Sequence, residues 1–182
     1  MNIPNLITLG RILLVPILVW AIATPGTMWI AFVLFLAAGV SDAVDGYLAK
    51  RFAMTTELGA YLDPLADKAL IVSIYLTLGI NGFIPRWLVI LVVSRDILIV
   101  GGIMLSWLVG SPLKIKPLLV SKLNTVAQIV FASVVLGSLG FNYELPTLTL
   151  ILMGLVAVLT LLSVAAYVAE WVRHMNTTAS GP

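Results

Sequence analysis

The stretch SDAVDGYLAKRFAMTTELGAYLDPLADK, residues 41–68, decides how this chain folds. It joins the end of one long apolar segment to the start of the next. Asp42 and Asp45 are three residues apart, and Asp63 and Asp67 are four apart. Residues at these spacings lie on one face of an α-helix. We therefore expect each pair of carboxylates to project from one side of its own helix.

The composition of the whole chain is that of a membrane protein. Of the 182 residues, 61% are hydrophobic and only 10% are charged, whereas soluble domains are about 45–50% apolar and about 25% charged. A single water-soluble core of this size cannot bury so much apolar surface, so lipid must cover part of it. The length leaves no room for a second large domain. We predict one membrane domain over residues 1–175 and a disordered tail over 176–182.

Six apolar segments are long enough to cross a bilayer, which takes about 20 residues. They cover roughly residues 5–23, 27–49, 58–80, 84–107, 118–139 and 146–171. Turn-forming residues separate them, at 24–26, 55–56, 81–82, 110–112 and 141–146. The sequence therefore predicts an all-α membrane protein with six transmembrane helices. The first segment has no basic stretch before it, so we expect a retained span and not a cleaved signal.

The basic residues predict the orientation, because cytoplasmic loops are enriched in lysine and arginine. The second and fourth connections and the C-terminal end carry Lys50, Arg51, Lys114, Lys116 and Arg173, whereas the opposite side carries only Arg86. We expect both termini, and the aspartate-bearing connection, to face the cytoplasm.

The four aspartates predict a metal site between the second and third helices. A short connection makes these helices antiparallel neighbours, which would bring the carboxylates together. An acidic residue at the centre of a membrane helix costs about 2.5–3.5 kcal/mol, and clustered carboxylates also repel one another. Nearby cations are Lys50, Arg51 and Lys68; bound metal is the other solution. Oxygen ligands favour Mg²⁺ or Mn²⁺ over zinc or copper.

Two other interpretations fit the spacing alone. The acidic pairs may be read as salt-bridged packing, or as the ion path of a small ion-coupled transporter. Small residues at Gly46, Ala49, Gly59 and Ala60 permit either close helix packing or space for a ligand.

The full ordered string resembles the signature of the CDP-alcohol phosphotransferases, D-x2-D-G-x2-A-R-x8-G-x3-D-x3-D. It is carried here by Asp42, Asp45, Gly46, Ala49, Lys50, Gly59, Asp63 and Asp67. All the gaps agree, and Lys50 stands where the pattern has arginine. Lysine keeps the positive charge but loses the planar fork of the guanidinium. The phosphate-binding role therefore falls to Lys50 or to its neighbour Arg51.

The resemblance implies a mechanism and site residues. Two divalent cations, Mg²⁺ or Mn²⁺, are held by the four aspartates and bind the diphosphate of a CDP-lipid, and CMP leaves. Asp67 is the implied base that takes the acceptor's proton. Gly46, Ala49 and Gly59 belong to the nucleotide-binding segment, with Gly46 and Ala49 against the cytidine. A homodimer is implied, and the net charge of +2 gives no support for nucleic-acid binding.

The acceptor alcohol is predicted from residues outside the signature. The stretches NIPNLITLGR, VVSRDILI and SKLNTVAQ resemble the cardiolipin synthases of the mitochondrial and related bacterial type. This resemblance implies phosphatidylglycerol as acceptor, CDP-diacylglycerol as donor and a bacterial inner membrane as the location. The alternative acceptor is glycerol 3-phosphate, as in the phosphatidylglycerophosphate synthases, which share the first stretch.

Basic residues that would serve either acceptor are Arg95, Lys116 and Lys122. The adjacent Arg95 and Asp96 are read either as a structural pair that links neighbouring helices or as a contact to the acceptor phosphate. Arg11 is expected to cap the cytoplasmic end of the first span or to contact lipid headgroups.

Overall fold

The computed structural model describes the backbone over residues 3–52, 57–108 and 119–179. Within these ranges it describes the side chains of residues 9–42, 44, 66, 68–101 and 119–171.

The described chain consists of six α-helices, which confirms the all-helical prediction. They are α1 (Ile3–Ala23), α2 (Met28–Phe52), α3 (Glu57–Ile80), α4 (Arg86–Leu108), α5 (Leu119–Gly140) and α6 (Pro146–Ala179). The bounds agree closely with the six predicted segments, apart from the end of α6. This helix continues to Ala179, beyond both the predicted end of the span and the predicted start of the tail.

The turns form where the sequence predicted them, because residues that tolerate positive φ stand at the helix ends. Gly82 has a φ of 78° and Asn142 a φ of 53°. After α3, the N–H of Phe83 donates to the carbonyl of Leu78 at 2.9 Å. After α5, the N–H of Tyr143 donates in the same way to Ser138 at 3.0 Å. Both are Schellman caps, which use the carbonyls left free at a helix C-terminus. The predicted turns at 55–56 and 110–112 lie outside the described residues.

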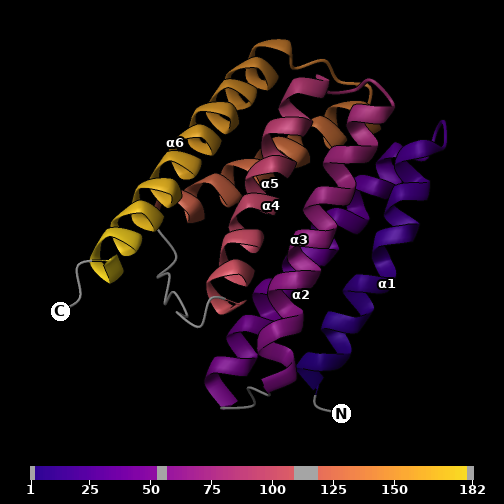
Figure 1. Cartoon of the computed structure of the whole chain (residues 1–182). Coiled ribbons are helices and arrows are strands. Elements are labelled where there is room, and N and C mark those ends of the chain that lie inside the picture. Colours follow the sequence, from indigo (N-terminus) through magenta and orange to yellow (C-terminus); the bar gives the residue numbers. More distant parts are fainter. Residues whose placement is uncertain (1–2, 53–56, 109–118, 180–182) are drawn as a thin grey trace.

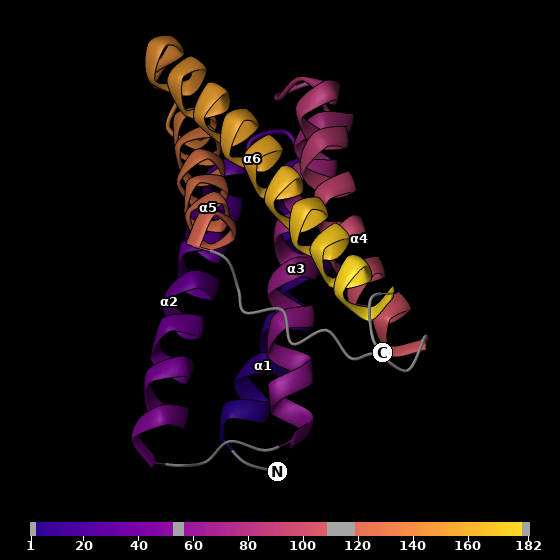
Figure 2. The same cartoon turned by 60° about the vertical axis from the view of Figure 1, so that its left-hand side comes forward.

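The helices alternate in direction, so that alternate helix ends meet at the same end of the molecule. The starts of α1 and α3 and the ends of α2, α4 and α6 point toward the lower end of Figure 1. Helix α1 packs against both α2 and α3, α5 packs against α2 and α6, and α4 packs against α3 and α6. In Figure 2, α2 and α4 lie on opposite sides, and α6 runs obliquely across the molecule from the side of α5 to the side of α4.

The direct packing of α2 against α3, predicted from their short connection, is not what the structure has. Among the described residues these helices make no close backbone contact, and α1 packs against both. A short connection fixes two helix ends near each other but leaves their distance farther along to the packing of other helices. Helix α1 thus takes part in the walls around the aspartates.

The surface is rich in large apolar side chains. Ile80, Ile90 and Ile97 are among those well exposed on α3 and α4. Two helical segments in the described residues, Leu119–Gly140 and Pro146–Trp171, are long and apolar enough by length and composition to cross a membrane. An exposed apolar surface of this extent marks a site of interaction with another apolar phase or partner.

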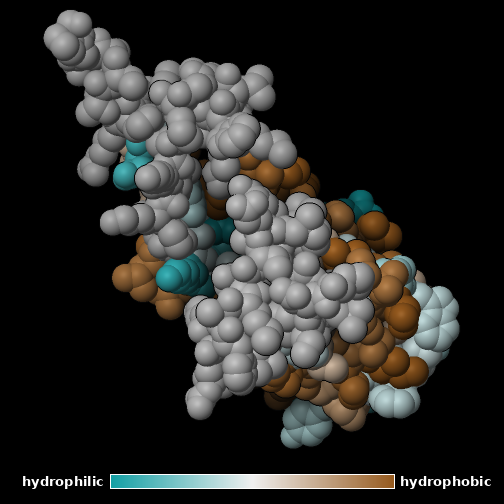
Figure 3. Space-filling model, turned by 90° about the horizontal axis from the view of Figure 1, so that it is seen from below, coloured by the Kyte–Doolittle hydropathy of each residue, from teal (hydrophilic) through white to brown (hydrophobic). Residues whose placement is uncertain are grey.

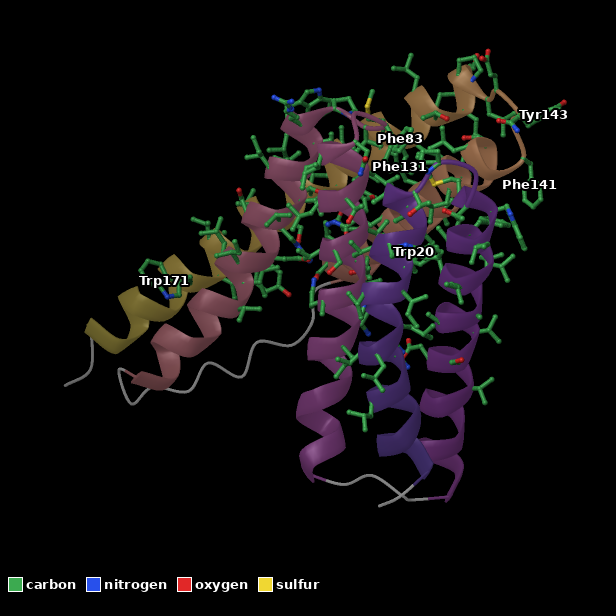
Figure 4. All side chains as sticks on the ribbon, turned by 90° about the vertical axis from the view of Figure 1, so that its right-hand side faces the viewer. Trp20, Phe83, Phe131, Phe141, Tyr143 and Trp171 are labelled. Atoms are coloured by element: carbon green, nitrogen blue, oxygen red, sulfur yellow. The ribbon has the colours of Figure 1, made fainter. Side chains whose placement is uncertain are left out.

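Aromatic side chains gather near the ends of the helices. Phe83, Phe141 and Tyr143 lie at one end of the molecule and Trp171 lies toward the other (Figure 4). Trp20 and Trp171 are about half exposed. This placement agrees with the interfacial aromatic belts of membrane proteins.

Gly140 at the end of α5 permits a close approach to the start of α2. A Cβ atom at this position would lie 2.8 Å from Trp29 Cα and 3.0 Å from Trp29 N. Both are backbone atoms that cannot turn away. We predict that Gly140→Ala destabilises the fold by about 1–3 kcal/mol, the usual cost of overpacking. The measurement is the thermal unfolding midpoint of the purified protein in detergent. Gly154→Ala is the matched control, because a Cβ there meets open space; equal midpoints for the two variants would contradict the packing argument.

Candidate metal and nucleotide site

The backbone places the four predicted aspartate residues in the halves of α2 and α3 that point toward one end of the bundle. Asp42 and Asp45 lie in the second half of α2, and Asp63 and Asp67 lie in the first half of α3. Because the two helices run in opposite directions, both segments are at the end where α2 finishes and α3 begins (Figure 1). Each pair keeps its helical spacing and therefore shares a helix face. Figure 3 views the molecule from this end, where a few hydrophilic side chains of described residues are seen.

Several predicted site residues have side chains outside the described set. They are Asp45, Gly46, Ala49, Lys50, Arg51, Gly59, Asp63, Asp67 and Lys116. Their convergence on a common pocket stays a prediction.

The carboxylate of Asp42 is paired with a cation from α1. Arg11 Nη1 lies 2.8 Å from Asp42 Oδ1. The arginine is 2% exposed and the aspartate side chain is 47% exposed, so one partner is buried and the other is half exposed. From the sequence, Arg11 was expected to cap the cytoplasmic end of the first span or to contact lipid headgroups, and its contact with an aspartate was not predicted. The available signal was an arginine within an apolar segment, which usually pairs with an acid or lines a polar cavity.

The donor chemistry of the chain fits a hard divalent cation. Among the described side chains no group of three or more histidine, cysteine or acidic residues is close enough to hold a metal. The full chain has no cysteine and a single histidine, so a nitrogen or sulfur site of the zinc type cannot be assembled from it. Carboxylates are the metal-binding side chains that remain, and oxygen ligands suit Mg²⁺ or Mn²⁺; that the aspartates of α2 and α3 hold such an ion stays a prediction.

A second charged group lies between α3 and α4. Lys68 Nζ and Arg95 Nη1 each lie 2.6 Å from the same atom, Asp96 Oδ1. Asp96 is 4% exposed and Arg95 is 1% exposed. Lys68 follows Asp67 directly in α3, so Asp96 fixes a cation one residue from the predicted base. Two cations thus share one oxygen of the Asp96 carboxylate.

Arg95 extends this group to two further helices. Its Nε donates to Ser163 Oγ of α6 at 3.1 Å, and Nη2 donates to the same oxygen at 3.0 Å. Nη2 also donates to Ser121 Oγ of α5. The planar fork of a guanidinium is suited to such simultaneous contacts. The structural interpretation of Arg95 and Asp96, a link between neighbouring helices, is therefore confirmed by these bonds. Lys122, another predicted acceptor residue, is exposed on α5.

An apolar groove runs along the outside of this charged group. Its volume is about 440 Å³, and its lining includes Lys68, Ala69, Val72, Val93, Asp96 and Ile97. Ile97 is 65% exposed, so the groove opens on the apolar flank of the molecule. A groove with mostly apolar walls and a charged pair in its lining can hold a molecule that is partly lipid and partly polar.

Comparison with known proteins assigns the chain to one protein family. Residues 1–174 match the sequence model of the CDP-alcohol phosphatidyltransferases. A chloroplastic CDP-diacylglycerol–glycerol-3-phosphate 3-phosphatidyltransferase of rice is 34% identical over 92% of this chain and 56% of its own length. The enzyme of the same name from Haemophilus influenzae is 34% identical over 91% of both chains. A probable CMP-forming cardiolipin synthase of Drosophila melanogaster is 32% identical over 79% of this chain and 49% of its own. The chain thus spans about half the length of the rice and fly relatives.

Asp96 compensates a buried guanidinium, so its loss should be costly. We predict that Asp96→Asn destabilises the protein by about 3–5 kcal/mol, the range for breaking one side of a buried ion pair. Thermal unfolding in detergent measures the effect. Glu144→Gln, at an exposed turn position, removes an acid outside the group and should shift stability by no more than about 0.5 kcal/mol. Similar unfolding midpoints for the two variants would rule out the compensating role.

Proposed function

This chain belongs to the CDP-alcohol phosphatidyltransferase family, a family of enzymes, and from this premise we propose that it transfers a phosphatidyl group from CDP-diacylglycerol to phosphatidylglycerol. The products are cardiolipin and CMP. The acceptor's hydroxyl oxygen forms a bond to the phosphorus of the phosphatidyl group, and the bond from that phosphorus to the CMP oxygen breaks. The observation that carries the proposal is the family match over residues 1–174, together with the ordered aspartates of α2 and α3. An ion-coupled transporter is not favoured, because the family is one of enzymes.

In this proposal the residues of α2 and α3 bind the donor. Asp42, Asp45, Asp63 and Asp67 would hold Mg²⁺ or Mn²⁺, which when bound neutralises the diphosphate and the charge that develops at phosphorus. Gly46, Ala49 and Gly59 give the nucleotide room, and Lys50 or Arg51 contacts a phosphate. Asp67 takes the proton from the attacking hydroxyl oxygen. Arg11, through its contact with Asp42, holds that carboxylate in place and offsets part of the negative charge.

Two observations support phosphatidylglycerol as the acceptor. The groove beside Lys68 and Asp96 is apolar and opens on the flank, as a lipid that approaches from the bilayer requires. Lys68 and Arg95, the cations that share Asp96, would attract the single phosphodiester charge of this lipid. Lys116 and Lys122 would contribute further attraction for anionic lipid at the membrane surface, about 1 kcal/mol each.

Glycerol 3-phosphate is the second candidate acceptor. The relative from Haemophilus influenzae, which matches over 91% of both chains, carries the name of a glycerol-3-phosphate 3-phosphatidyltransferase. Such an acceptor is a small dianion and would need a more strongly basic pocket than a phosphodiester does.

We place the enzyme in a bacterial inner membrane as a homodimer of six-span subunits. Both termini and the aspartate-bearing ends of α2 and α3 face the cytoplasm in this proposal. Support comes from the apolar exposed surface, from the alternation of six helices (Figure 1) and from the basic residues near the predicted cytoplasmic end.

The identity of the lipid product tests the acceptor. We expect purified protein with Mn²⁺ or Mg²⁺ to convert CDP-diacylglycerol and phosphatidylglycerol to cardiolipin, with one CMP released for each cardiolipin formed. The products of parallel reactions with phosphatidylglycerol and with glycerol 3-phosphate are identified by mass spectrometry. Phosphatidylglycerophosphate as the only lipid product would replace our choice by the second acceptor. No CMP release with either acceptor would refute the proposed function.

Asp67 has a role of its own that one substitution can test. We predict that Asp67→Asn lowers kcat by about 100-fold or more, the lower end of the contribution of a general base, while CDP-diacylglycerol still binds. Rates are measured at saturating divalent cation, so that weaker metal binding does not mask the effect, and donor binding is measured separately. Glu170→Gln, at an exposed position of α6, is the control that should keep full activity. Full activity of Asp67→Asn would remove this residue from the role of base.

A further inference from the structure

Two amide side chains buried between the helices lack partners for their polar atoms. Asn124 and Gln128 of α5 are both 0% exposed. Within the described part of the chain, Asn124 Nδ2 has no hydrogen-bond partner, and neither has Nε2 or Oε1 of Gln128. Buried polar atoms are normally paired, and an unpaired one is especially unfavourable in a helix surrounded by lipid. A binding role would account for two such amides on one helix.

These amides continue a row of polar residues that begins at the charged group. Ser121, Asn124 and Gln128 are spaced by three and four residues on α5 and so share one face; we call them the α5 polar row. Its outer member, Ser121, accepts a hydrogen bond from Arg95. The row extends roughly 10 Å along the helix axis, at 1.5 Å per residue.

The neighbouring helices occupy only some of the polar atoms in this row. Thr160 Oγ1 of α6 donates to Asn124 Oδ1 at 3.0 Å. The hydroxyl of Tyr75 in α3 donates to the main-chain carbonyl of Gln128 at 3.1 Å and not to its side chain. These contacts fix the backbone and one side-chain oxygen of the row. They leave the Gln128 amide and the amino group of Asn124 without a hydrogen-bond partner among the described residues.

We propose that Asn124 and Gln128 bind the hydroxyl groups of the acceptor's glycerol unit and thereby help to select the acceptor. This inference rests on the proposed function. An amide presents both a donor and an acceptor, which matches neighbouring hydroxyl groups that each donate and accept. Both candidate acceptors carry a phosphate on a glycerol with neighbouring free hydroxyls. Arg95, at the outer end of the row, supplies positive charge on the side where the phosphate belongs, and the neutral amides suit the uncharged diol.

The test separates substrate binding from a structural role. Gln128→Met keeps the length and removes the amide, and it breaks no side-chain hydrogen bond of the folded protein. We expect the KM for the acceptor to rise about tenfold or more, with the KM for CDP-diacylglycerol unchanged, because an interaction made with one substrate alone is lost. Gln128→Asn keeps an amide on a shorter side chain and should give a smaller rise.

Thr77→Val is the matched control. Thr77 is also buried, at 8% exposure, but its hydroxyl donates to the Ser73 carbonyl of its own helix at 2.6 Å. Neither KM should move in this variant. A binding measurement without turnover complements the kinetics. Phosphatidylglycerol micelles and glycerol 3-phosphate are each added to the protein, and the thermal unfolding midpoint is measured. The acceptor that raises the midpoint of the wild type should raise that of Gln128→Met much less.

The outcomes distinguish this inference from the proposed function. An unchanged acceptor KM in Gln128→Met, or an equal rise of both KM values, would overturn the role of the amides. The proposed function would still hold in that case, provided that the wild type releases CMP. Absence of CMP release by the wild type with either acceptor would overturn both.

Discussion

The compensation of charge inside an apolar molecule is the constraint on which this structure depends. An unpaired ion away from water is costly, so each buried charge must meet its opposite across helices. Arg11 of α1 reaches Asp42 of α2, and Asp96 of α4 holds Lys68 of α3 beside its own neighbour Arg95. These contacts set the relative positions of four helices near the predicted site. The same pairs therefore contribute both to the fold and to the electrostatics of the site.

The sequence predicted the helices well and their packing less well. Segment length and turn residues identified all six helices, because an apolar segment must satisfy its own backbone hydrogen bonds and because Gly82 and Asn142 stand where the chain needs a positive φ. Neighbour relations depend on side-chain shape over long distances. For this reason the insertion of α1 against both α2 and α3 was not predicted, and neither was the contact between Arg11 and Asp42.

In the candidate site too, features set by local sequence spacing were predicted, and contacts between residues distant in the sequence were not. The ordered aspartates of residues 42–67 follow from helical spacing and from the family signature, and the family match supports their chemistry. The interaction of Lys68 with Asp96 joins residues 28 positions apart, and that of Arg95 with Ser163 joins residues 68 apart. No local pattern carries such information. Asn124 and Gln128 were not singled out either, since a buried amide is recognised as unusual only when its neighbours in space are known.

In the proposed reaction, the distribution of polar groups would let one bundle bind a lipid donor and a lipid acceptor at separate places. Carboxylates on α2 and α3 concentrate negative charge that a hard cation would balance. On α3 and α4, Lys68 and Arg95 share the carboxylate of Asp96, and Lys68 and Asp96 line an apolar groove. A reaction between two anionic lipids has to overcome their mutual repulsion as well as the barrier at phosphorus. Separate binding of the donor diphosphate through cations and of the acceptor phosphate through Arg95 and Lys68 would relieve that repulsion before bond formation, leaving proton removal as the task of a single carboxylate.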